Sequence, residues 1–211
     1  MKKILIVVLL MVIPLSLFAM NDILIGLDGG FHWMHTSGDG TEGNLYSPSA
    51  GFSMFTFIEN SNWGVKASFS FFFPQSGDIT LAGQTYDFSK DDIFDIIFGF
   101  DTMIGASYNI IKDDALFVPI SLGIHYNLLS MNLIGKLGSA LSYSFGAAAS
   151  VSVIKVFSER FYVMADMMLV YDFYQFNSYE LVGNQTSESG SITQFIFNPK
   201  IGVGVKFKSW K

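Results

Sequence analysis

The sequence of 211 residues contains no cysteine. This absence excludes disulfide scaffolds, thiolate metal sites, thiol catalysis and a cysteine-linked lipid anchor. Charged residues are also scarce, at 14% of the chain, and basic residues are the minority, with 12 Lys and Arg against 18 Asp and Glu. The chain therefore lacks the basic excess of a nucleic-acid-binding protein. It also lacks the low hydrophobicity of a disordered chain, because half of its residues are hydrophobic.

The chain has one long uncharged apolar run, at its N-terminus. Lys2 and Lys3 precede an uncharged stretch from Ile4 to Pro14, and a small residue, Ala19, follows shortly after. This layout predicts a secretory signal peptide over residues 1–19. The alternative is a permanent membrane helix, since the uncharged run to Asn21 covers 18 residues. Such a helix needs about 20 apolar residues, and this run is interrupted by proline, so we expect cleavage after Ala19.

Residues 20–211 alternate between apolar residues and small or polar ones, which is the period of a β-strand. In one segment Trp63, Val65, Ala67, Phe69 and Phe71 share one face, and Gly64, Lys66, Ser68 and Ser70 share the other. Eight such segments are predicted, at about 23–34, 49–59, 63–73, 93–109, 116–128, 140–153, 160–174 and 192–207. With no internal repeat or linker between them, they form a single domain over residues 20–211.

The connections between these segments also alternate. Long polar stretches follow the odd-numbered segments: Met34–Pro48, Pro74–Asp92, Leu128–Ser139 and Gln175–Ser191. Short turns follow the even-numbered ones: Asn60–Asn62, Ile110–Ala115 and Ile154–Glu159. Two of the long stretches contain the signal for a small hairpin, around Ala82-Gly83 and Gly183-Asn184. An even strand number with long loops at one end predicts an all-β, antiparallel, up-and-down transmembrane β-barrel.

A soluble lipocalin-like barrel shows the same alternation, so the character of the two faces has to distinguish it from a membrane barrel. The face opposite the bulky apolar residues is mostly Gly, Ser and Ala. These small residues suit the crowded lumen of an eight-stranded barrel and would make a poor surface toward water. The bulky apolar face is then the lipid-facing one.

Aromatic residues at the ends of the segments support this orientation, because Trp and Tyr collect at both interfaces of a membrane. Near the long-loop ends lie Trp33, Tyr126, Tyr143 and Tyr171, and near the short-turn ends lie Trp63, Tyr108, Phe207 and Trp210.

In these features the chain resembles the small eight-stranded outer-membrane barrels of the OmpX, OmpW and OmpA transmembrane-domain families. The resemblance is architectural and covers residues 20–211. In such families the assembly machinery recognises a last strand that ends on an aromatic residue. The last segment here alternates through Val203, Val205 and Phe207, but the chain ends in Lys211, which departs from that pattern. The resemblance implies an outer-membrane location and, through the OmpW-like group, transport of small or hydrophobic molecules.

The register of the segments places charged residues inside the barrel, where they should pair because an isolated buried charge is costly. The predicted lumen charge network consists of Asp28, Lys66, Asp101, Arg160, Asp166 and Lys200. Glu59, Asp95, Asp172, Lys206, His32 and His125 also point inward by register. We expect a salt-bridged plug, since eight strands leave little interior space. A gated pore or a binding site is the alternative.

The long loops are acidic and hold two further alternatives. Asp87, Asp91 and Asp92 could form a divalent-cation site, but they lack the spacing of a known calcium loop, so we expect a solvated surface. His35-Thr36-Ser37 places a nucleophile near a base, but adjacency in sequence is not the geometry of a catalytic triad. We therefore predict no catalytic residue, no metal site and no cofactor.

These inferences predict a monomeric barrel in the outer membrane of a diderm bacterium, with a structural or surface-interaction role. The expected partners are outer-membrane lipid and the barrel-assembly machinery, without nucleic acid, while the partner of the extracellular loops stays open. The alternative function is an OmpW-like channel for small or hydrophobic molecules.

Overall fold

The computed structural model describes residues 20–38, 41–81, 84–87, 94–113, 115–133, 138–181, 184–190 and 192–208. The expected signal peptide lies outside these residues. The described strands are β1 (Met20–Gly38), β2 (Thr41–Ile58), β3 (Trp63–Phe72), β4 (Ser76–Leu81), β5 (Gln84–Asp87), β6 (Phe94–Lys112), β7 (Leu116–Leu133), β8 (Gly138–Phe157), β9 (Phe161–Leu181), β10 (Asn184–Gly190) and β11 (Thr193–Lys208). Within the described part of the chain, no helix is long and apolar enough to cross a membrane.

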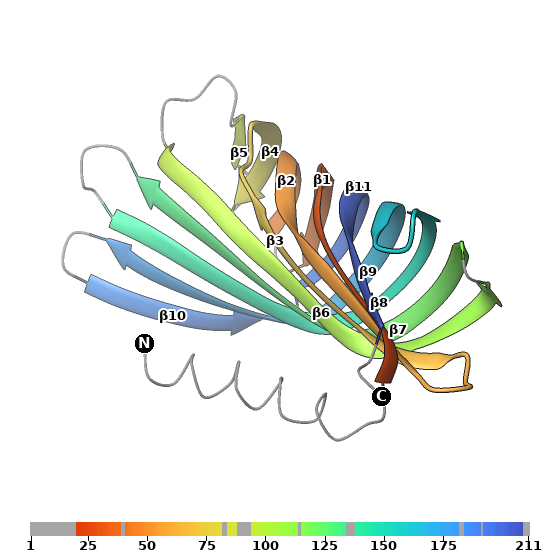
Figure 1. Cartoon of the computed structure of the whole chain (residues 1–211). Helices are drawn as coiled ribbons and strands as arrows, with labels where there is room; N and C mark the ends of the chain where they lie inside the picture. The colour runs from red at the N-terminus through yellow and green to blue at the C-terminus, as the bar shows by residue number, and fades with distance from the viewer. Residues whose placement is uncertain are drawn as a thin grey trace.

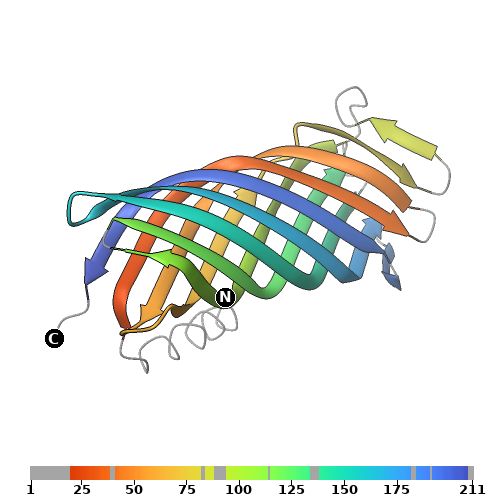
Figure 2. The ribbon, with the colours of Figure 1, turned by 90° about the vertical axis from the view of Figure 1, so that its right-hand side faces the viewer.

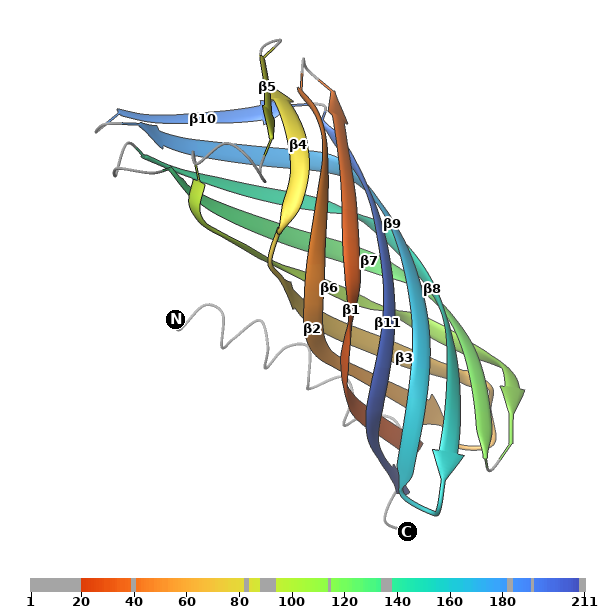
Figure 3. The ribbon, with the colours of Figure 1, turned by 90° about the horizontal axis from the view of Figure 1, so that it is seen from above.

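The sheet closes on itself, because β1 pairs antiparallel with both β2 and β11 (Figures 1 and 2). Around the ring the order is β1, β2, β3, β6, β7, β8, β9 and β11, and every pairing is antiparallel. This confirms the predicted eight-stranded antiparallel barrel. The remaining strands extend the wall at the long-loop end, where β4 pairs with β2, β5 with β4, and β10 with β9 (Figure 3).

The predicted faces are also confirmed. In β3 the even-numbered residues from Gly64 to Phe72 are buried, and the odd-numbered residues from Trp63 to Phe71 are half-buried or exposed. In β8 the same alternation runs over the strand, with Ser150 and Ser152 buried and Val153 exposed. The small and polar face therefore points into the lumen, and the bulky face points outward.

Two of the long loops predicted from polarity are wrong, because their residues continue the strands. β1 runs on to Gly38 and β2 begins at Thr41, with His35 opposite Asn44 in the ladder. Likewise β7 reaches Leu133 and β8 begins at Gly138. Backbone hydrogen bonds do not depend on side-chain polarity, so a hairpin outside the lipid can use polar residues throughout. The two small hairpins are confirmed, as β4 with β5 and as β9 with β10.

The short-turn end is compact, since the strands there are joined over residues 59–62, 113–115 and 158–160. Asn60 and Ser158 have positive φ angles of 56° and 55°, so each of these two turns contains one left-handed residue. Asn is among the residues that tolerate this conformation best. In the turn after β6, the Asp113 carboxylate accepts backbone hydrogen bonds from Ala115 and Leu116, which lower the pKa of that carboxyl.

Inside the barrel, apolar side chains form two clusters at different depths. The turn-end cluster is Leu24, Phe55, Phe57, Phe117, Ile154, Val156, Tyr162 and Met164. The loop-end cluster is Met34, Leu45, Phe72, Met103, Leu129, Ala148, Met168, Val170 and Ile196. Polar side chains contact both clusters, since the Lys66 ammonium lies over the Phe55 ring and the His32 ring stacks on Phe72. The lumen is therefore a packed interior.

Candidate functional site in the barrel lumen

An ion pair between Lys66 on β3 and Asp166 on β9 crosses the lumen. The Lys66 ammonium lies 2.7 Å from both carboxylate oxygens of Asp166, and the exposed fraction of each side chain is 0%. Ser150 accepts a hydrogen bond from Lys66 at 2.9 Å, and Ser152 donates one to Asp166 at 2.6 Å. The ammonium also lies 5.3 Å from the centre of the Phe55 ring, in the turn-end cluster. A fully desolvated pair of this kind is held by its surrounding hydrogen bonds.

Lys200 lies beside this pair but does not share it. Lys200 and Asp166 are register partners on β11 and β9, yet the Lys200 ammonium donates to Ser70 on β3. Asp28 on β1 accepts a hydrogen bond from Ser53 at 2.6 Å. All of these side chains are buried. The strand register thus identifies which residues are neighbours on adjacent strands. The side-chain contacts themselves form across the lumen, between strands on opposite walls.

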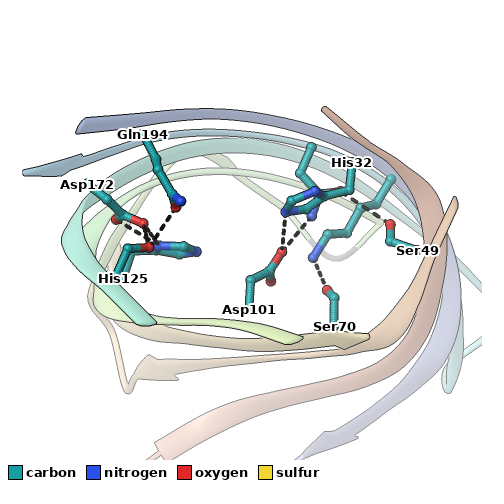
Figure 4. Close-up of polar contacts among 10 residues, drawn as sticks. His32, Ser49, Ser70, Asp101, His125, Asp172 and Gln194 are labelled. Atoms are coloured by element: carbon teal, nitrogen blue, oxygen red, sulfur yellow. Dashed lines mark hydrogen bonds and ion pairs between the residues drawn. The ribbon is translucent and has the colours of Figure 1, made fainter. Parts of the chain in front are cut away.

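A histidine–carboxylate pair lies next to these groups, on the right of Figure 4. The His32 Nε2 atom is 3.3 Å from an Asp101 carboxylate oxygen, and the Asn198 amide donates to the same oxygen at 3.1 Å. The His32 ring stacks on Phe72 with 4.0 Å between ring centroids and 5° between planes. This stacking joins the polar level to the loop-end cluster.

A second histidine–carboxylate pair lies on the opposite wall, on the left of Figure 4. His125 Nδ1 is 3.0 Å and 3.2 Å from the two oxygens of Asp172. Ser144 also hydrogen-bonds to Asp172 and lies 2.8 Å from the side-chain oxygen of Gln194. The network continues through Gln175, which accepts from Gln194 and donates to Ser142 and Asn177. Strand parity predicted both inward histidines, but it did not identify their carboxylate partners.

Two of the charges predicted to be inward are not in the lumen. Arg160 and Glu59 are exposed, and both lie in the short turns rather than in strands. Parity assigns a face only within a strand, and β9 begins one residue after Arg160. The remaining members of the predicted network, Asp28, Lys66, Asp101, Asp166 and Lys200, are buried. Nothing is described for the side chain of Asp95.

Lys206 provides one further charge at the turn end of the lumen. Its ammonium is 3.2 Å from Asp22 and 4.5 Å from the centre of the Phe117 ring. Unlike Lys66 and Asp166, this pair is partly reached by solvent, with exposed fractions of 5% and 15%.

The predicted interface aromatics lie on the outward face wherever they are described. Trp63 packs edge-on against Tyr108 with centroids 5.0 Å apart, and Trp33 donates to Asn44 at 3.3 Å. Tyr126 and Tyr143 are half-buried beside Phe100 and Phe176, while Tyr171 and Phe207 are exposed. Trp210 lies outside the described residues.

Neither serine–histidine combination has the geometry of a nucleophile with its base. His35 pairs with Asn44 at 3.1 Å, and Asp39 lies outside the described residues. In the lumen, Ser144 hydrogen-bonds to Asp172 and not to His125, whereas a catalytic serine needs the imidazole as its base. Over the described ranges, no three His, Asp or Glu side chains converge closely enough to bind a metal ion.

Solved structures with the same architecture are outer-membrane barrels. The outer membrane protein OprG from Pseudomonas aeruginosa superposes with a TM-score of 0.64 at 15% identity, covering 91% of this chain and 98% of that one. The chain has the fold of the small outer-membrane β-barrels. AlkL, determined in lipid bilayers, gives a TM-score of 0.58 at 12% identity, with 92% and 93% of the two chains covered. A major outer membrane protein from Thermus thermophilus gives 0.56 at 14% identity, with 85% and 99% covered.

No family model and no curated protein matches this chain. At 12–15% identity, the likeness to these solved structures concerns the fold.

Proposed function

We propose that this barrel is a closed anchor in the outer membrane that presents its extended hairpins for structural or surface interactions. The observation that carries this proposal is the Lys66–Asp166 pair, which spans the lumen from β3 to β9 with no exposed surface on either side chain. The turn-end cluster fills the lumen on one side of it, and the loop-end cluster fills the other side. Apolar packing on both sides of a neutralised pair leaves an ion no polar route through the barrel.

The hairpins beyond the barrel supply the surface for such interactions. β4 and β5 place Asp78 directly opposite Asp87, and Asn44 on β2 lies opposite Asp78. Side chains that face each other in this way lie on the same face of a sheet, so the two carboxylates share one face of the hairpin. Glu42 is exposed on the neighbouring β1–β2 hairpin. Asp78, Asp87 and Glu42 thus give the hairpins an acidic surface. Such a surface suits a basic partner, or an acidic partner held through a bridging cation. A catalytic step is not part of the proposal.

We propose that the short turns and both ends of the barrel domain lie on the periplasmic side, because an even number of strands returns the chain to the side where it started. The signal peptide expected over residues 1–19 would direct secretion, and the last strand would be read by the barrel-assembly machinery. The folded protein is proposed to be a monomer surrounded by outer-membrane lipid.

Conductance in a planar bilayer tests the closed lumen. The wild-type barrel is expected to give no stepwise current, because the ion pair and the two apolar clusters close the lumen. The double variant Lys66→Ser/Asp166→Ser shortens both crossing side chains without leaving a charge unpaired, and brief current steps are expected from it. A heat-dependent gel shift of both proteins, recovered from the bilayer lipid, shows that they are inserted and folded. Regular current steps from the wild type would contradict the proposal.

A channel for small hydrophobic molecules is the second candidate, and the composition of the loop-end cluster favours it. Met34, Met103 and Met168 contribute three flexible thioether side chains to this cluster. Methionine side chains are more flexible than branched ones, so the side chains in this half of the lumen could rearrange to admit an apolar ligand.

Uptake of an uncharged apolar dye into vesicles distinguishes the two candidates. An anchor with a closed lumen is expected to leave the uptake rate equal to that of protein-free vesicles. Faster uptake through the wild type, reduced by a bulky Met103→Trp substitution in the loop-end cluster, would place the channel first. A tryptophan at an outward alanine, Ala106→Trp, is the control because it introduces the same indole ring on the outward face.

A further inference from the structure

A groove of about 610 Å³ runs over the outer wall of the barrel, across β1, β11, β9 and β8. The ladder aligns its outward residues in two rows. The first row is Gly29, Ile201, Ala165 and Val153, and the second is Leu27, Val203, Val163 and Lys155. Leu27 and Ile201 are 72% and 74% exposed, higher fractions than those of the other large hydrophobic side chains on the described surface. The groove is thus an aliphatic hollow between prominent side chains.

Small residues form the floor of this hollow. Ala165 has only a methyl group, and a Cβ atom added at Gly29 would meet nothing closer than the Ser49 carbonyl oxygen at 3.4 Å. At the lumen-facing glycines, such as Gly30 and Gly51, the same atom would lie 2.0 Å from backbone oxygen. A Cβ atom at Gly29 would therefore be in ordinary van der Waals contact, so the outer surface there accepts a larger side chain without a clash.

Lys155 gives the groove a charge at one end. It is exposed on the outer wall, two residues before the end of β8 at Phe157. Among the side chains described on the outward face of the strands, it is the one cation, because Arg160 lies in a turn and the inward face holds Lys66, Lys112, Lys200 and Lys206. The neighbouring Asp113 carboxylate accepts hydrogen bonds from two backbone N–H groups and is also attracted by Lys155, but within the described residues the two side chains form no direct ion pair.

The depth of the groove matches one leaflet of a membrane. Strands advance by about 3.3 Å per residue, so Val153, four residues from the end of β8, lies roughly 13 Å along the strand from the short turn. The usual strand tilt of about 40° reduces this length to a depth of roughly 10 Å. The hydrocarbon core is about 30 Å thick, so each leaflet contributes about 15 Å. The hollow thus lies at acyl-chain depth, and Lys155 lies near the headgroup level, where a lysine extends its ammonium to the interface.

We infer that this groove binds one phospholipid of the leaflet at the short-turn end, with an acyl chain in the hollow over Gly29 and Ala165 and the phosphate at Lys155. The inference rests on the proposed membrane location of the barrel. The aliphatic lining matches an acyl chain, and the single cation at the interface matches an anionic headgroup. An acyl chain that fills the hollow exchanges contacts with mobile lipid for a fixed, closely packed wall.

Native mass spectrometry tests this inference. The full barrel is reconstituted in nanodiscs of equal parts phosphatidylglycerol and phosphatidylethanolamine and then released into detergent. The wild type is expected to retain one phospholipid, with phosphatidylglycerol enriched. Gly29→Leu and, separately, Ala165→Leu are each expected to lower the lipid-bound fraction about tenfold, a change of about 1.4 kcal/mol, because each leucine fills space that the acyl chain would occupy. Lys155→Gln is expected to abolish the enrichment of phosphatidylglycerol.

Ala106→Leu is the matched control, since Ala106 is an exposed outward alanine on β6, a strand that does not line the groove. It is expected to bind lipid like the wild type, and the heat-dependent gel shift shows that every variant is folded. Equal lipid retention by the wild type and both leucine variants would overturn the inference. A protein dimer without lipid would also overturn it, because the hollow would then be covered by a second copy. Neither outcome depends on whether the lumen conducts.

Discussion

Replacing Lys66 by methionine is expected to lower the free energy of unfolding of the barrel by about 3–5 kcal/mol. The substitution leaves the Asp166 carboxylate buried at 0% exposure with Ser152 as its remaining hydrogen-bond donor. Removing one partner of a desolvated pair costs more than the pair itself contributes, because the other charge stays buried. Urea unfolding in detergent micelles, followed by the heat-dependent gel shift, measures the loss.

Two further variants show whether this loss is electrostatic. Adding Asp166→Asn to Lys66→Met should restore part of the stability, since the unpaired carboxylate is then neutral. Lys206→Met removes a cation of equal size whose partner, Asp22, is 15% exposed, and it should cost less than Lys66→Met because water can solvate the carboxylate that is left behind. If Lys66→Met and Lys206→Met lose the same small amount, water reaches the Lys66 level and the closed-lumen proposal fails.

Replacing Tyr162 by alanine is expected to cost about 3–5 kcal/mol of unfolding free energy, because it empties the centre of the turn-end cluster. The side chain is 1% exposed. Its ring packs against Gly26 on β1 and Gly204 on β11, which are partners where the barrel closes. A Cβ atom added at Gly26 would lie 2.5 Å from the Tyr162 hydroxyl oxygen, and one added at Gly204 would lie 2.4 Å from the ring. The neighbouring backbone of a closed barrel has little freedom to collapse into the resulting cavity. The same urea titration measures the loss.

Tyr162→Phe separates the ring from its hydroxyl group. The hydroxyl has no hydrogen-bond partner among the described residues, so its removal is expected to change stability by less than about 1 kcal/mol. Tyr171→Ala, at an outward tyrosine that is 54% exposed, controls for the general effect of losing an aromatic ring. A loss from Tyr162→Phe as large as that from Tyr162→Ala would show that the hydroxyl, rather than the packing of the ring, stabilises the cluster.

Alternation in the sequence predicts which side of the wall each strand residue faces, and therefore most of the architecture. The inward position of Lys66 and the outward position of Trp63 follow from a period of two alone. Burial in lipid or in the lumen imposes that period, so it is strongest where the wall is in the membrane. Beyond the membrane the constraint disappears, which is why the sequence around strand residues such as Thr41 and Asn132 predicts loops.

Contacts across the lumen could not be predicted in the same way. The strand stagger of a barrel decides which inward residues share a depth, and alternation carries no information about stagger. Lys200 is the register neighbour of Asp166, yet the side chain that reaches Asp166 comes from β3. The carboxylate partners of His32 and His125 were missed for the same reason. The groove was missed because its floor joins Gly29 and Ala165, which lie on strands far apart in sequence.

The crossing ion pair also bears on how the barrel assembles. Lys66 and Asp166 are 100 residues apart, and their strands are not neighbours in the ring. The two charges do not meet within any single hairpin. They also stay apart in a flat sheet of adjacent hairpins, because β3 and β9 are not neighbours. The pair forms only when the sheet has curled far enough to bring β3 opposite β9. A sheet that entered a bilayer before curling would carry two unpaired charges, so we expect half-inserted intermediates to be disfavoured relative to the closed barrel.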